Sequence, residues 1–178
     1  MDVLIFQKRR LFAFGIAALV ALASAAAWGA LSESDVKAAY LYNFARYVTW
    51  PADAFRSPEE PIRICIVGDD SFRDLLRGVV ADKRVGDRPV SAESRGGVGE
   101  SKGCHILFVG DARAGAVSTL SGRSVFTVSD SEGFAAEGGI ANFVLVGNKV
   151  RFEINTSAVE KAGLQVSSRL LRVAQIVE

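Results

Sequence analysis

The sequence contains little of what most catalytic and metal sites are built from. Its 178 residues include one histidine, His105, and two cysteines, Cys65 and Cys104. Any imidazole base would have to be His105, and a site of Cys and His ligands would lack the number that zinc needs. Cys104 and His105 are adjacent in an apolar run, so on a strand their side chains point to opposite faces and cannot pair. We therefore expect no catalytic residue, no metal and no cofactor.

A strong excess of charge of one sign is also missing. The formal net charge is +1, and basic and acidic residues are mixed along the chain. This distribution gives no electrostatic case for binding nucleic acid. The segment Gly96–Lys102 is rich in glycine, but it precedes a predicted strand, whereas a phosphate-binding loop follows a strand and opens a helix.

The first residues of the chain have the pattern of a secretory signal peptide. Lys8, Arg9 and Arg10 precede an apolar run that starts at Leu11, and small residues follow in the segment 23–27. We expect residues 1–25 to be removed on export, with cleavage after Ala27 as an alternative, and residues 26–178 to form one domain. An uncleaved anchor helix is the other interpretation, but the run is shorter than the roughly 20 residues that span a bilayer.

An exported chain resides in an oxidising compartment, where an even pair of cysteines usually forms a disulfide bond. A bond between Cys65 and Cys104 would close a loop of about 40 residues and stabilise the fold by roughly 4 kcal/mol in the chain-entropy view. Two buried free thiols are the alternative.

The order of apolar segments predicts an α/β fold. Helical spacing predicts helices over residues 32–50, 70–80 and 168–177, and runs with both faces apolar predict strands over residues 62–68, 104–110 and 124–128. Gly147 and Asn148 separate two further strand-like runs, 142–146 and 149–154, as in a tight hairpin. We therefore expect a single-domain sandwich with a mostly parallel central sheet, an antiparallel C-terminal hairpin at its edge, and helices on both faces.

Aromatic residues are concentrated around the end of the first predicted helix. Tyr42 lies off the main apolar stripe, and Trp50 lies at the helix end before a proline. Tyrosine, tryptophan and arginine dominate the contacts that carry binding energy in protein interfaces. Packing in the core is the alternative role for these aromatic side chains. The candidate partner-binding residues are Tyr42, Tyr47, Trp50, Phe55 and, on the last predicted helix, Arg169.

Acidic residues follow three predicted strands and suggest a second type of site. Asp69, Asp111 and Asp130 each come after such a strand, and ligands of parallel sheets bind at the carboxyl ends of strands. Asp69 and Asp111 are the candidate ligand-binding residues. The alternative hypothesis is therefore a small-ligand-binding sensor or carrier that uses this cleft. Aspartate after a strand is also ordinary turn chemistry.

Several segments in this order resemble the YfiR family of exported proteins. The resemblance starts with the segment KAAYLYNFARYVTWP (37–51) and continues with ICIVGD (64–69), CHILFV (104–109) and VFTVSD (125–130). It ends with VRFEIN (150–155) and SSRLL (167–171), and so covers nearly all of the chain after the signal pattern.

The resemblance implies a periplasmic α/β protein, often a homodimer, that represses signalling through cyclic di-GMP, and with it biofilm formation. Its expected partner is the periplasmic domain of an inner-membrane diguanylate cyclase or similar sensor. An outer-membrane lipoprotein that binds peptidoglycan is the expected second partner. The matching positions of Cys65 and Cys104 support the disulfide bond. The chain lacks the second cysteine pair of the best-known member, so redox control through a second bond is not expected.

Overall fold

Helix α2 opens the described part of the chain. A computed structural model describes residues 31–110, 117, 120 and 122–177, and residues 32–178 form one compact unit. Helix α2 spans Glu33–Tyr47; the Ser32 side chain accepts from the Asp35 N–H, and the Asp35 side chain accepts from the Ser32 N–H. This reciprocal pair satisfies two backbone donors at the start of the helix.

Helix α2 ends earlier than the predicted position 50. Val48 is extended, with φ −99° and ψ 139°, and strand β1 (Val48–Thr49) pairs with strand β9 (Gln165–Val166) in a separate antiparallel ribbon. Two β-branched residues at this point favour the extended backbone over a further helical turn. Trp50 therefore follows a short strand.

Among the described residues, the main sheet has eight strands in the order β10-β8-β7-β6-β5-β2-β4-β3. Their bounds are β2 Ile62–Val67, β3 Arg84–Val85, β4 Arg88–Arg95, β5 Ile106–Val109, β6 Phe126–Ser129, β7 Ala141–Val146, β8 Lys149–Asn155 and β10 Gln175–Val177. Strands β4, β2, β5, β6 and β7 pair in parallel, and β7 pairs antiparallel with β8. The predicted α/β fold, with a mostly parallel sheet and an antiparallel hairpin, is confirmed.

The final segment differs from its predicted helix over 168–177. Helix α5 covers only Ser168–Leu171, and β10 then pairs in parallel with β8, with Ile176 opposite Ile154. The β7–β8 hairpin is therefore flanked by one more strand. Gly147 and Asn148 have φ of 54° and 61°, the positive values that a tight hairpin turn requires.

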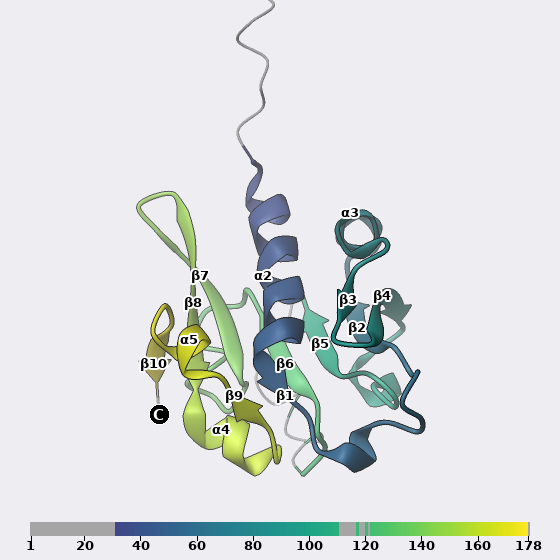
Figure 1. Ribbon diagram of the computed structural model, residues 1–178. Coiled ribbons are helices and arrows are strands. Elements are labelled where there is room, and N and C mark those ends of the chain that lie inside the picture. Colours follow the sequence, from purple (N-terminus) through teal and green to yellow (C-terminus); the bar gives the residue numbers. More distant parts are fainter. Residues whose placement is uncertain (1–30, 111–116, 118–119, 121, 178) are drawn as a thin grey trace, which may run out of the picture. The chain divides into compact units, whose positions relative to one another are not determined.

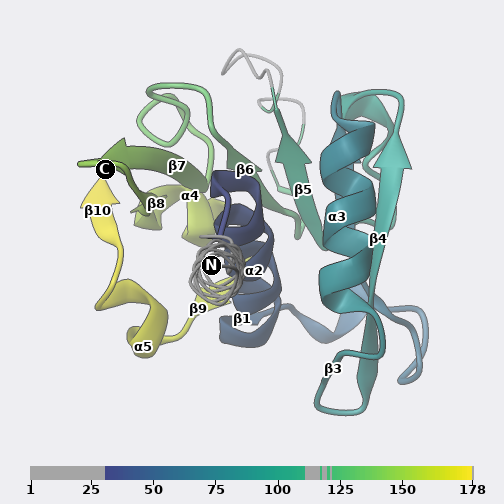
Figure 2. The same ribbon diagram turned by 90° about the horizontal axis from the view of Figure 1, so that it is seen from above.

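Helices α2 and α3 (Asp70–Val80) lie side by side on one face of the sheet (Figures 1 and 2). Phe44 of α2 packs against Phe126, with ring centroids 5.3 Å apart, and Phe72 of α3 packs against Phe108 at 4.9 Å. These contacts belong to the larger of the two buried apolar clusters that the described residues form. Helix α4 (Thr156–Lys161) follows β8, where Asn155 caps its start by accepting from the Ala158 N–H.

The second buried cluster includes strand residues whose side chains point away from α2 and α3. It joins Leu107 and Val109 of β5 to the two cysteines and to loop residues such as Phe134. In the described part of the chain this face is covered by loops, including the short 3-10 turn Val98–Glu100. Cys65 and Cys104 form the predicted disulfide bond within this cluster, with their Cα atoms 5.8 Å apart.

Candidate functional site

His105 organises a buried polar cluster just after helix α2. Its side chain is 2% exposed. Its Nδ1 atom accepts from the Arg63 N–H at 3.1 Å, and its Nε2 atom lies 3.2 Å from the Ala54 carbonyl oxygen. A carbonyl oxygen only accepts, so Nε2 carries the proton and the neutral ring satisfies both contacts. Burial lowers the pKa of His105 below its ordinary value. Both ring nitrogens are thus used in holding backbone.

Trp50 belongs to this cluster and lies inside the fold. It is 8% exposed, and its Nε1–H donates to the His105 carbonyl oxygen at 3.1 Å. A buried tryptophan that finds a partner for its N–H is a stabilising core residue. Trp50 was predicted to contact a partner, but its side chain lies beneath the surface and supports it from inside the fold.

Phe55 is half-buried and covers the same histidine from the solvent side. Its ring stacks on the His105 ring with centroids 4.4 Å apart, and the Arg88 guanidinium carbon lies 3.7 Å from the centre of the Phe55 ring. The Arg88 guanidinium also donates to the carbonyl oxygens of Ser57 and Glu60. Phe55 is therefore part of a three-layer stack whose outermost member is an arginine.

Tyr42 and Tyr47 lie on a separate surface of α2. Both are half-buried, and the exposed Arg46 places its guanidinium carbon 5.9 Å from the centre of the Tyr42 ring and 5.4 Å from that of the Tyr47 ring. We call Tyr42, Arg46 and Tyr47 the tyrosine–arginine strip. Sequence reasoning missed Arg46, although it is four residues from Tyr42, the spacing that brings helical side chains together.

The C-terminal segment that carries Arg169 is tied by a backbone hydrogen bond to the end of this strip. The Ser167 N–H donates to the Tyr47 carbonyl oxygen at 2.9 Å, and Arg169 is exposed two residues further on in α5. The structure therefore brings Arg169 toward Tyr47, while Trp50 and Phe55 are assembled around His105.

The acidic pair of the alternative hypothesis is only partly described. Asp69 is exposed, and its Oδ1 atom accepts from the Phe72 N–H at 2.8 Å, which caps helix α3. Its carboxylate already has the structural role that aspartate commonly takes at a helix start. Asp111 lies outside the described residues.

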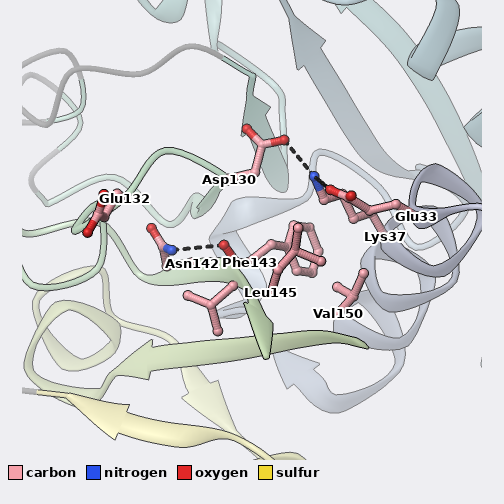
Figure 3. A pocket seen from close by; sticks show the side chains of 9 residues that line it. Glu33, Lys37, Asp130, Glu132, Asn142, Phe143, Leu145 and Val150 are labelled. Carbon is pink, nitrogen blue, oxygen red and sulfur yellow. Dashed lines mark hydrogen bonds and ion pairs between the residues drawn. The ribbon is translucent and has the colours of Figure 1, made fainter. Parts of the chain in front are cut away.

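A cavity of about 430 Å³ lies at the other end of α2, beside the end of β6 and the start of β7 (Figure 3). Lys37 of α2 places its Nζ atom 2.6 Å from Glu33 Oε1 and 2.8 Å from Asp130 Oδ2. Burial alone would lower the Lys37 pKa, but its hydrogen bonds to Asp130 and Glu33, with their charges, outweigh this and raise it above the usual value. Asn142 of β7 also lines the cavity.

Sequence reasoning noted Asp130 only as a residue that follows a strand. It missed Lys37 and Asn142. The available signals were a Glu33–Lys37 pair at helical spacing and a single asparagine within an apolar strand, which is uncommon for a fully buried position.

The described residues limit two further classes of site. None of them form a group of three or more His, Cys, Asp or Glu side chains placed to hold a metal ion. Among the helices of the described segments, none combines the length and apolar character needed to cross a membrane.

Comparison with solved structures finds partial likeness. One similar structure is the ABC domain in complex with L-Trp from Streptococcus pneumonia, at 11% identity and TM-score 0.47, covering 65% of this chain and 55% of the other. Another is a conserved domain protein from Vibrio cholerae, at 11% identity and TM-score 0.44, covering 66% and 55%. The chain thus spans about half the length of each.

Comparison with protein families gives a match along most of the chain. A family model described as YfiR/HmsC-like matches residues 34–175. The matched region includes every strand of the sheet except the last two residues of β10, both cysteines, and the tyrosine–arginine strip. The chain therefore belongs to the YfiR/HmsC-like family.

Proposed function

We propose that this chain is a periplasmic regulatory protein that binds and inhibits an inner-membrane sensor, a diguanylate cyclase, and so lowers cyclic di-GMP. The observation that carries the proposal is the YfiR/HmsC-like match over residues 34–175. The export pattern of residues 1–25 and the Cys65–Cys104 bond agree with an oxidising compartment. Regulation here requires binding and no chemistry, which agrees with the structural use of His105.

The proposed mechanism is a shift of population. A regulator inhibits a sensor when it binds the inactive conformation more tightly than the active one, and the difference in affinity limits the size of the effect. On the periplasmic side the chain needs only a surface that distinguishes these two conformations. An outer-membrane lipoprotein that binds peptidoglycan would release the sensor by competing for this chain, and a homodimer is the form that we propose for the regulator.

The tyrosine–arginine strip with Arg169 is the contact surface that we favour. Two half-buried tyrosines around an exposed arginine provide large rigid rings beside a charged group, the composition of interface residues that carry most binding energy. Arg46 and Arg169 are both exposed, so a partner surface with carboxylates would be complementary. Phe55, with Arg88 over its ring, is the second part of the proposed surface.

Cellular cyclic di-GMP after deletion of the gene is the test of function. We expect the level to rise, and to return to normal when the full chain is expressed but not when residues 1–25 are left out. An unchanged level after deletion would contradict the proposed regulation of a cyclase.

Binding to the purified periplasmic domain of the sensor tests the contact surface. Arg46→Ala and Tyr47→Ala are each expected to weaken binding about tenfold or more. Arg77→Ala is the matched control, because Arg77 is an exposed arginine on α3 with a 3.8 Å contact to Asp74. If both strip variants bind like the control, the surface lies elsewhere.

A further inference from the structure

The cavity beside β7 has a net acidic lining. The lining contains three carboxylates, those of Glu33, Asp130 and Glu132, and one ammonium group, that of Lys37. Lys37 is already shared between Glu33 and Asp130, so its charge is neutralised by the protein itself. The remaining negative charge favours a cation in the cavity and disfavours an anion.

Asn142 supplies a second, independent indication of a ligand. Its side chain is fully buried, and its Nδ2 atom donates to the Phe143 carbonyl oxygen at 3.0 Å. Within the described residues its Oδ1 atom has no hydrogen-bond partner. Figure 3 draws Oδ1 on the side of Asn142 that faces Glu132. A buried acceptor without a donor is unfavourable, and a ligand N–H group would satisfy it.

The remaining wall of the cavity is apolar. Phe143 and Val150 are core residues that reach the cavity, and Leu145 on the projecting hairpin is 59% exposed. A polar end and an apolar wall in one cavity of about 430 Å³ are typical of sites for small organic molecules.

We propose that this cavity binds a small organic cation, a primary ammonium group attached to a short apolar moiety. The ammonium group donates to Asp130 and to the Oδ1 atom of Asn142, and the apolar moiety packs against Phe143 and Leu145. This site shares no residue with the tyrosine–arginine strip, and the proposal stands whether or not the chain regulates a cyclase.

Calorimetric titration of the purified chain tests the proposal with three probes of similar shape. 2-Phenylethylammonium has the required charge, 2-phenylethanol is its neutral counterpart, and 3-phenylpropanoate is an anion. We expect the ammonium probe to bind at millimolar concentration or below, and the other two to bind at least about tenfold more weakly. Equal binding of the neutral or anionic probe, or no binding of the ammonium probe, would overturn the proposal.

Two variants and a matched control locate the site. Asp130→Asn is expected to weaken binding of the ammonium probe about tenfold. Asp70→Asn is the control, because Asp70 is also an exposed aspartate with a basic partner at 2.8 Å, but lies on α3. Equal affinity in the two aspartate variants would overturn the location.

Asn142→Leu is expected to have a similar effect, provided that the variant melts like wild type. For a variant that does not, the side-chain NH₂ resonances of Asn142 in the wild-type chain give the answer. They shift on addition of the ammonium probe if the proposal is right and stay unchanged if it is wrong.

Discussion

The two ends of helix α2 differ in how their polar atoms are satisfied. Beyond its C-terminal end, Trp50 donates to the His105 carbonyl oxygen and both ring nitrogens of His105 contact backbone. Near its N-terminal end, Lys37 bridges two carboxylates while the buried Oδ1 atom of Asn142 has no partner among the described residues. The comparison teaches that the aromatic-rich segment, which drew attention in the sequence, partly forms a closed structural cluster. The open cavity is lined by polar residues that are ordinary in the sequence.

Trp50→Ala breaks the closed cluster and has the largest expected effect. Loss of a buried tryptophan leaves a cavity and removes a hydrogen bond, so the free energy of unfolding should fall by about 3–5 kcal/mol. Urea denaturation measures this, and Trp50→Phe separates the lost volume from the lost N–H. A loss of less than about 1 kcal/mol in Trp50→Ala would contradict the view that Trp50 is a well-packed core residue of this cluster.

The pH dependence of stability tests the same cluster. In the folded chain, burial lowers the pKa of His105 below the value of 6.5 that the histidine has when it is unfolded. As the pH falls below 6.5, the unfolded chain therefore takes up a proton that the folded chain does not. The contribution of the neutral ring is fully present above pH 6.5 and is lost as the pH falls toward the lower, folded-state pKa. Denaturation midpoints at several pH values measure this loss.

His105→Gln is the control for the pH effect, because glutamine keeps a donor and an acceptor but does not titrate near neutrality. The variant should be less stable than wild type above pH 6.5, and its stability should fall less steeply below it. Parallel curves for the two proteins would assign the pH dependence to other groups, such as Glu60.

Asn142→Leu sharpens the contrast from the open end. The change removes one hydrogen bond and also an unpartnered buried oxygen, so the free energy of unfolding should change by less than about 1 kcal/mol. Urea denaturation checks this beside Asn155→Leu, which removes a buried asparagine whose oxygen and nitrogen are both bonded. We expect the Asn155 variant to lose more stability, and the reverse order would contradict the contrast.

Arg46→Ala should also have only a small effect on stability. Its guanidinium lies over two rings at the surface, an arrangement that contributes about 0.5–1 kcal/mol at exposed sites. A loss of several kcal/mol on urea denaturation would mean that Arg46 supports the fold, and would move the proposed contact surface away from the strip.

The parts of the fold that were predicted correctly are those whose signal is local. Residues 62–68 and 104–110 are apolar on both faces because central strands of the sheet are covered on both sides. The Gly147–Asn148 turn was recognisable because few residues adopt positive φ at low cost. The segment 168–177 was mispredicted because its apolar spacing suits a helix, whereas its actual partner is β8, a pairing that the segment's own residues do not reveal.

The candidate sites were harder to predict because they join residues that are distant in sequence. Trp50 meets the carbonyl of His105, 55 residues away, and Lys37 meets Asp130, 93 residues away. The sequence identifies Trp50 and Phe55 as aromatic, but how deeply each side chain is buried depends on the distant segments that cover it. Arg88, from strand β4, covers the ring of Phe55.

The Cys65–Cys104 bond closes the segment between the two cysteines into a covalent ring. The ring includes α3, β3, β4 and the exposed turn at Gly86 and Asp87. A protease that cuts once within this ring opens it without dividing the molecule, and both fragments stay attached. Gel electrophoresis of such a nicked protein would give one band without reductant and two bands with it, so a protein that seems intact can already be cut.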